Sequence, residues 1–448
     1  MNFPHWLSEH PEHSGVLPEA VDCVVIGGGV IGVTAALYMA REGMKVVLLE
    51  KGRIGAEQST RNWGWIRTQG RDMAEIPLSL EARGLWRDLD QNCKNKLGIK
   101  TVGVSYLANS DKSLGRFETW LRLASQHTDL DSRILSRREV MAMFPLTAAK
   151  WHGALHTPSD MRGEPWIAVP EIARLAVSEG VIIRESCAAR GLEHTAGTLS
   201  AVITESGSIR TEQVVVAAGA WSSLFLRAHG VSLPQLSVRS TVATTIPSEV
   251  GHEGAAVDGV FAWRLRDDGG YTLAPAAYSE LFIGPDAFRA FPSYMKLLRA
   301  GGFDVALRPW APKGFPDAWS TARKWRMDEV SPFEKCRILD PEPNRRKLSE
   351  LPERFAAAFP SNRAPVVSKA WAGMIDVMPD VVPVVDRLAD LDGVIVATGM
   401  CGHGFGIGPA FGLTIAKMAL GQPPKHDLTR FRSGRFSDGT PLVPGPNL

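Results

Sequence analysis

The sequence predicts a mixed α/β protein (α+β mixed) with a Rossmann-like nucleotide-binding unit near its N-terminus and a second part rich in strands. Three observations predict this class. The chain has 448 residues, which is enough for two or three domains. A glycine-rich turn, Gly27–Gly32, separates a short β-branched run from an Ala-rich run. Residues 236–285 hold several strand-like segments and a hairpin signal at Asp267–Gly270.

The elements follow in order from these patterns. Cys23–Ile26 and Lys45–Glu50 have the aliphatic composition of buried parallel strands, and Val33–Glu42 is the helix between them, ended by Gly43. We expect further helices at 78–89, 113–125, 165–179, 220–229 and 411–420. We expect further strands at 103–107, 181–184, 199–204, 213–218 and 393–398, the last followed by a glycine-dense loop at 399–408. Residues 286–360 show no readable pattern.

Composition and charge exclude several classes of protein. Hydrophobic residues make up 44% and charged residues 22%, which excludes a disordered chain, a collagen and a disulfide scaffold. The net charge of +2 gives no sign of nucleic-acid binding. The five cysteines form no CxxC pair, so we expect no zinc site or redox disulfide and no bound metal, and a cytoplasmic location. The N-terminus lacks a signal-peptide pattern, and strand, turn and buried helix explain 21–40 better than a membrane span.

The glycine turn fits the pattern GxGxxG at Gly27, Gly29 and Gly32, between a strand and a helix as this motif requires. Absent side chains at Gly27 and Gly29 allow a sharp turn and the approach of a pyrophosphate, and Gly32 allows close packing of helix on strand. The helix N-terminus offers free N–H groups to the anion. Glu50 ends the second strand and can accept hydrogen bonds from an adenosine ribose. The motif alone leaves FAD and NAD open.

Three later segments narrow the choice. They are GAEQSTRNWGWIRTQG at 55–70, VVVAAGAWS at 214–222, and the stretch 371–412 with its P-D, P-V and GHGF pattern. Together with the glycine turn they resemble the D-amino-acid oxidase superfamily of FAD enzymes, which includes glycine oxidase, sarcosine oxidase and γ-glutamylputrescine oxidase. The resemblance spans residues 20–435 except roughly 285–360.

The resemblance implies a discontinuous FAD-binding domain, made of residues 20–100, 160–230 and 365–435. It also implies a substrate domain built on an antiparallel sheet, made of 101–159 and 231–364, with a leader at 1–19 and a tail at 436–448. The residues expected to contact FAD are Gly27, Gly29, Val30, Ile31, Gly32, Glu50, Lys51, Ser59, Arg61, Asn62, Trp63, Ala189, Ala218, Gly219, Trp221, Gly402, His403, Gly404, Phe405 and Gly406.

Two departures from the family pattern bear on the chemistry. Sarcosine-oxidase-like members attach the flavin through a cysteine in the segment that corresponds to 373–378, which has none here, so we expect non-covalent FAD. No essential acid–base residue is assigned, because hydride transfer in this superfamily rests on orientation and electrostatics. We read Cys401, in the glycine-dense loop, as a packed residue.

A substrate carboxylate needs a cationic partner, ideally a bidentate arginine. Arg266 occupies the place of the carboxylate arginine of glycine oxidase, Arg264 shares its face by period two, and Arg67 aligns with that of sarcosine oxidase. Asp376 is a candidate partner of a substrate ammonium. Aromatic residues expected to form walls of the pocket are Trp63, Trp65, Trp263, Tyr271 and Trp371.

These features predict an FAD-dependent oxidoreductase that oxidises the C–N bond of an amine or amino acid to an imine, which water then hydrolyses. Oxygen or a quinone would accept the electrons. A non-catalytic flavoprotein subunit or assembly factor is the alternative from another class. A flavin hydroxylase is less favoured, because the last strand ends ATGMCGHGF without the Gly-Asp pair of those enzymes. Substrate identity, oligomeric state and the role of 285–360 stay open.

Overall fold

The computed structural model describes residues 10–248, 252–299, 305–360 and 364–446. Its six-stranded sheet has the order β21-β22-β13-β1-β2-β9. Five of these strands run parallel, and β21 is antiparallel to β22. The strands are β1 (Cys23–Ile26), β2 (Val46–Leu49), β9 (Ile182–Arg184), β13 (Val214–Val216), β21 (Val384–Arg387) and β22 (Val394–Thr398).

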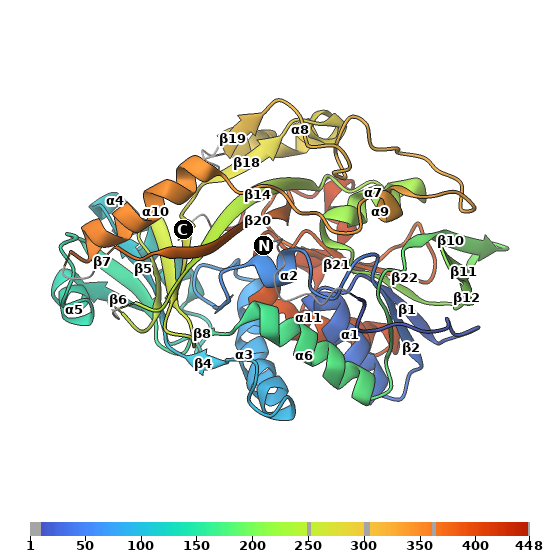
Figure 1. Ribbon diagram of the computed structural model, residues 1–448, viewed down its shortest axis with the longest axis horizontal. Helices are drawn as coiled ribbons and strands as arrows, with labels where there is room; N and C mark the ends of the chain where they lie inside the picture. Colours follow the sequence, from blue (N-terminus) through green and yellow to red (C-terminus); the bar gives the residue numbers. More distant parts are fainter. Residues whose placement is uncertain (1–9, 249–251, 300–304, 361–363, 447–448) are drawn as a thin grey trace.

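Both faces of this sheet are buried, which explains why its strands are apolar throughout. Cys23 and Val25 point to a layer of helices, whereas Val24 and Ile26 point to the opposite face. Figure 1 shows the helices gathered beside β1 and β2. They are α1 (Val30–Arg41), α3 (Glu75–Asn92), α6 (Pro165–Ser178) and α11 (Gly404–Ala419). The other face carries β10 (Ala189–Thr195), β11 (Thr198–Thr204), β12 (Gly207–Arg210) and α7 (Ser222–Ala228).

A ten-stranded sheet forms the second part, in the order β19-β18-β14-β17-β16-β15-β5-β7-β6 with β20 also paired to β14. Most neighbours are antiparallel, so the expected mixed class with an antiparallel second sheet is confirmed. Its strands are β5 (Val104–Ala108), β6 (Arg133–Ser136), β7 (Gly153–Thr157), β14 (Leu236–Thr245), β15 (Ala255–Val257), β16 (Phe261–Leu265), β17 (Tyr271–Pro275), β18 (Ser279–Phe282), β19 (Val305–Arg308) and β20 (Val367–Val377).

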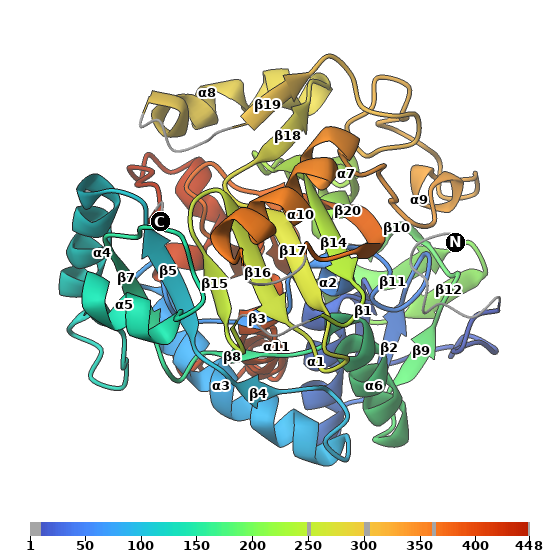
Figure 2. The ribbon, with the colours of Figure 1, turned by 60° about the vertical axis from the view of Figure 1, so that its left-hand side comes forward.

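Helices and a small sheet complete the second part and its junction with the first. Figure 2 shows α10 lying across β14, β16 and β17. The helices are α2 (Gln58–Arg61), α4 (Asp111–Ala124), α5 (Arg137–Met143), α8 (Pro285–Arg299), α9 (Pro332–Lys335) and α10 (Arg345–Ala358). The small sheet has the order β3-β8-β4, made of Trp65–Ile66, Met161–Arg162 and Lys100–Thr101.

The predicted helices and strands agree with the structure to within about three residues at each end, except for the last helix. We expected a loop at 399–408 and a helix at 411–420, but α11 begins at Gly404. The glycines that suggested a loop serve close helix packing instead. A Cβ on Gly408 would lie 2.9 Å from Val30 of α1, and one on Gly412 would lie 2.2 Å from Thr34 Oγ1.

The chain ends pack on the body where they are described. Residues 1–9 and 447–448 lie outside the described residues. The N–H groups of Glu12 and His13 donate to Glu185, and Gly445 N–H donates to Asp380 O at 2.8 Å. β20 lies within 365–435 yet belongs to the large sheet, so it joins the two parts, and the domain limits stay a prediction. None of the described helices has both the length and the apolarity that crossing a membrane requires.

Candidate functional site

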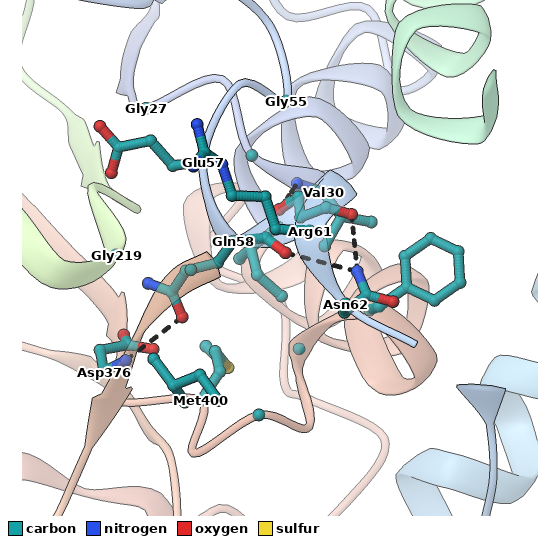
Figure 3. A pocket seen from close by; sticks show the side chains of 18 of the residues that line it. Gly27, Val30, Gly55, Glu57, Gln58, Arg61, Asn62, Gly219, Asp376 and Met400 are labelled. Atoms are coloured by element: carbon teal, nitrogen blue, oxygen red, sulfur yellow. Dashed lines mark hydrogen bonds between the residues drawn. The ribbon is translucent and has the colours of Figure 1, made fainter. Parts of the chain in front are cut away.

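A cavity of about 390 Å³ lies where the two sheets meet. Figure 3 shows the α2 segment between the glycine turn, at Gly27 and Val30, and the end of β20 at Asp376. The lining comes from segments far apart in the chain, with residues within 26–31, 49–67, 217–221, 240–242, 275–279, 373–376 and 397–405. The convergence of these segments creates a long site that no single segment forms.

The glycine turn forms one wall through absent side chains. Gly27 has φ +114°, and a Cβ there would lie 2.3 Å from Ala217 O. A Cβ on Gly32 would lie 2.0 Å from Gly27 O, so Gly32 serves the packing of α1 and does not itself line the cavity. Gly29 is the N-cap of α1 and offers no side chain to cap it. The start of α1 is therefore a cradle for an anion such as a pyrophosphate.

Glu50 lies at the end of β2 and lines the same wall. Its carboxylate accepts hydrogen bonds from Gly28 N–H at 2.8 Å and Gly52 N–H at 2.7 Å. Burial raises the pKa of Glu50 to about 7, against the lowering effect of Lys51 and these two N–H groups. Its remaining lone pairs face a site suited to ribose hydroxyls.

The α2 segment is fixed by contacts from all sides. Arg61 Nη1 donates to Asp340 at 2.6 Å and to Ala372 O at 2.9 Å, and burial lowers the pKa of this guanidinium. Ser59 Oγ accepts from Val30 N–H at 2.9 Å, which ties the segment to α1. Asn62 donates to Ser59 O at 2.8 Å, a contact visible in Figure 3. A segment held this rigidly can pack against the edge of a planar ring system.

Asp376 closes the cavity between β20 and α11. Its side chain is 1% exposed, Oδ2 accepts from Gly399 N–H at 2.7 Å, and its own N–H donates to Gln58 Oε1 at 3.2 Å. Burial raises the pKa of Asp376. Oδ1 has no hydrogen-bond partner among the described residues, so this buried acceptor is available to a bound group.

A cluster of ionisable residues lies at the start of α11. His403 is the N-cap of this helix, and its Nδ1 is 2.9 Å from Oε1 of the buried Glu75. Burial, and then the nearby Arg71, lower the pKa of His403 to about 4. His403 is therefore neutral at neutral pH, donates Nδ1–H to the carboxylate, and leaves the helix N-terminus as the positive element.

Arg71 and Arg67 both line the cavity beside this cluster. Arg71 is 2% exposed, and its Nη1 has no hydrogen-bond partner among the described residues. Burial, and then Arg67, lower the pKa of Arg71 to about 9. The Arg67 guanidinium lies 5.3 Å from the centre of the Tyr106 ring. Two neighbouring cations in a cavity favour an anionic guest.

Most residues expected to contact FAD line the cavity, and Gly32 and Gly406 do not. A Cβ on Gly406 would lie 3.2 Å from Trp65 O, so that glycine serves packing of α11 on β3. Of the residues expected to contact substrate, Arg67, Trp65 and Asp376 line the cavity. Five do not: Arg264, Arg266, Trp263, Tyr271 and Trp371.

These five have structural contacts that replace the expected role. Arg266 donates to Tyr271 O at 2.6 Å and Thr245 O at 3.0 Å, which braces the hairpin. Arg264 is fully buried and donates to both oxygens of Glu164, at 2.8 and 3.1 Å.

The three aromatic residues of this set, Trp263, Tyr271 and Trp371, lie in the hydrophobic core. Trp263 packs against Phe359, and Tyr271 packs against Phe355. Phe355 belongs to α10, and Phe359 directly follows that helix. Trp371 donates Nε1–H to Arg61 O at 3.0 Å. It thereby supports the α2 segment from behind.

The sequence reasoning missed Arg71, Gln58, Tyr278 and Ser279, which line the cavity. Arg71 lies four residues after Arg67 in the same segment, so a wider reading of that segment would have included it. No local pattern marks Tyr278 and Ser279, because only the fold of β17 and β18 brings them to the cavity.

The parallel sheet with its glycine turn, together with a cavity that continues into a second sheet, defines a dinucleotide-dependent oxidoreductase. The sequence model of the family DAO, FAD dependent oxidoreductase, matches residues 22–418. The chain therefore belongs to the DAO family, as the resemblance predicted, and its cofactor is FAD. The glycine turn at the start of α1, the Glu50 carboxylate on the cavity wall and the unpartnered Asp376 Oδ1 fit such a group.

Known relatives place the chain among FAD enzymes that oxidise amines or amino acids. It is 27% identical over 285 residues to mitochondrial sarcosine dehydrogenase of Mus musculus, covering 59% of this chain and only 30% of that protein. It is 25% identical over 431 residues to N-methyl-L-tryptophan oxidase of Citrobacter koseri, covering 93% and 99%. The structure of L-amino acid deaminase from Proteus myxofaciens in complex with anthranilate has a TM-score of 0.89 at 29% identity, covering 95% of both chains.

Proposed function

We propose that this protein oxidises the C–N bond of an amino acid that carries a free carboxylate. One observation supports this choice above the others, namely the charge pairing of the cavity. Three cations of the lining have carboxylate partners: Lys51 with Glu57, Arg53 with Glu185, and Arg61 with Asp340. Arg67 and Arg71 form no salt bridge within the described part of the chain. A substrate carboxylate supplies the missing anion.

The residues of the chain have distinct roles in this proposal. Arg71, with Arg67 beside it, holds the carboxylate, while Trp63 and Trp65, whose ring centres are 5.1 Å apart, form an apolar wall. Asp376, with its unpartnered Oδ1, receives the substrate nitrogen or the ring system. The residues expected to contact FAD keep that role. FAD, when bound, accepts the hydride from the substrate carbon.

No strong base is part of the proposal. His403 has a pKa of about 4 and its Nδ1–H is directed to Glu75, so it neither carries a charge nor takes a proton through that nitrogen at neutral pH. The residues of this chain contribute to catalysis by orienting the substrate between the two arginines and the aromatic wall.

The names of the relatives support an amino acid over a simple amine. Sarcosine dehydrogenase, N-methyl-L-tryptophan oxidase and L-amino acid deaminase are all named for amino-acid substrates. Oxygen or a quinone as acceptor, non-covalent FAD and a cytoplasmic location are further parts of the proposal. All five cysteines are free thiols, which supports a reducing compartment.

An anaerobic substrate panel tests the proposal. The purified holoenzyme is mixed with amino acids, N-alkyl amino acids and the matching amines that lack the carboxylate. We expect loss of the flavin absorption band with at least one amino acid and none with its decarboxylated partner. Repeating the best substrate in air shows whether peroxide forms. If no compound of the panel bleaches the flavin, the proposal fails and a non-catalytic flavoprotein becomes the better reading.

A further inference from the structure

Helix α8 lies at one edge of the molecule in Figures 1 and 2, and it has two apolar faces. One face is buried: Ala290, Tyr294 and Leu297 pack with Leu236 and Val377. The Tyr294 hydroxyl donates to Val377 O at 2.7 Å. This face anchors the helix to β14 and β20, so the orientation of the rest of the helix is fixed.

An adjacent side of the helix exposes large apolar side chains to solvent. Phe288, Phe291 and Leu298 are 65%, 54% and 53% exposed. Their spacing of three and seven residues puts them on one side of a helix with about 3.6 residues per turn. Trp319, which is 61% exposed, extends this surface because its ring centre is 6.1 Å from that of Phe288. We call these four residues the α8 stripe.

The segment that carries the stripe is basic on its outside. Residues 285–326 contain eight Lys and Arg against three Asp and Glu. The two acidic residues described there are engaged: Asp286 with Arg227 and Arg289, and Asp317 with Arg323. Two more of these cations pair with acids outside this range, Arg308 with Glu280 and Arg326 with Asp328. The positive excess around the stripe therefore rests on Arg299, Lys313 and Lys324, which are exposed and form no salt bridge among the described residues.

We propose that the α8 stripe docks this protein onto an anionic lipid surface. Exposed Phe and Trp on one helix side, next to Lys and Arg, have the composition of an interfacial membrane contact, in which rings enter the headgroup region and cations meet anionic lipid. A second copy of the chain fits less well, because a two-fold contact would place the same positive excess against itself. The contact needs no spanning helix.

Vesicle co-sedimentation of the full-length holoenzyme tests this proposal. The probes are vesicles of phosphatidylcholine alone and of an equal mixture of phosphatidylcholine and phosphatidylglycerol. We expect binding to the mixed vesicles that weakens as salt is added, and little binding to phosphatidylcholine. The double variant Phe288→Ser/Phe291→Ser should bind at least about tenfold more weakly, since two rings no longer leave water.

A matched control variant tests whether weaker vesicle binding is specific to the α8 stripe or follows from the removal of any two exposed apolar side chains. Leu123 and Val366 are each 59% exposed, and Leu123→Ser/Val366→Ser should bind like the unchanged chain. Flavin absorbance and melting temperature check that both variants are folded.

Three results would overturn the proposal. They are no binding to either vesicle, equal binding of the two double variants, and a self-associated form in sedimentation velocity that Phe288→Ser/Phe291→Ser abolishes without any vesicle binding.

Discussion

Replacing Arg71 with Met is expected to stabilise the substrate-free enzyme and to weaken substrate binding in the same variant. The Arg71 guanidinium is 2% exposed and Nη1 has no hydrogen-bond partner among the described residues. Burial lowers its pKa to about 9, so the charged form is held at a cost in free energy until an anion binds. Met fills a similar volume without the charge.

The two effects have separable magnitudes. A charge-assisted hydrogen bond contributes about 1.5–3 kcal/mol, so loss of a two-bond carboxylate contact predicts at least about a hundredfold weaker binding. Replacing a buried ion pair by apolar groups often stabilises a fold by about 1–4 kcal/mol, and we expect a gain of that order for this unpaired ion. Since the folded-state pKa of Arg71 lies below that of the unfolded chain, the free-energy penalty is greatest at neutral pH. It decreases as the pH rises through about 9.

Anaerobic flavin titration gives the apparent Kd for the amino acid, and chemical denaturation gives the free energy of unfolding. Arg435→Met is the matched control, because Arg435 is also 2% exposed but donates to Asp380 at 2.8 and 3.1 Å. Breaking that buried pair should destabilise the chain by about 3 kcal/mol with unchanged substrate affinity. Unchanged affinity in Arg71→Met, or destabilisation like that of Arg435→Met, would refute the assignment of Arg71.

Three further predictions concern the cofactor wall and the helix start. Glu50→Gln should weaken FAD binding about tenfold at pH 8, above the Glu50 pKa of about 7, because a charged acceptor at the proposed ribose site becomes neutral; flavin fluorescence measures the change. Gly412→Ala should lower the melting temperature, since its Cβ would lie 2.2 Å from Thr34 Oγ1, whereas Gly115→Ala, with no atom within 4 Å, should raise it slightly. His403, with its lowered pKa of about 4, makes the fold less stable as the pH falls from its ordinary value towards 4, and His403→Gln should reduce that slope in denaturation curves.

The local elements of the nucleotide-binding unit could be predicted from sequence because each is set by neighbouring residues. The strand Cys23–Ile26 has the predicted bounds, and the helix expected at 165–179 spans Pro165–Ser178. The geometry of a glycine turn between two apolar runs is set by the residues of the turn and of those runs. The hairpin at Asp267–Gly270 was likewise local, and it joins β16 to β17.

The substrate end could not be predicted in the same way, because the pairing of charges is a property of the fold. Period-two alternation puts Arg264 and Arg266 on one face of the expected strand, but it does not show that Glu164, a hundred residues earlier, already neutralises Arg264. Arg71 shows the reverse. Asp72 and Glu75 lie within four residues of it in the sequence, yet its Nη1 has no hydrogen-bond partner among the described residues. Which arginine is available to a ligand is decided by contacts distant in sequence.

The start of α11 shows why helix propensity failed at the position that matters most for the site. Gly404, Gly406, Gly408 and Pro409 are poor helix formers, and each residue costs the helix free energy. The close approach of α1 and β3 recovers that cost, because no residue larger than glycine fits at Gly408 and Gly412. The consequence is functional: beginning at Gly404, and not at Phe411, places the N-terminus of α11 on the cavity lining beside His403. The residues that weaken the helix locally are therefore those that bring its positive end to the cavity in which we propose that FAD binds.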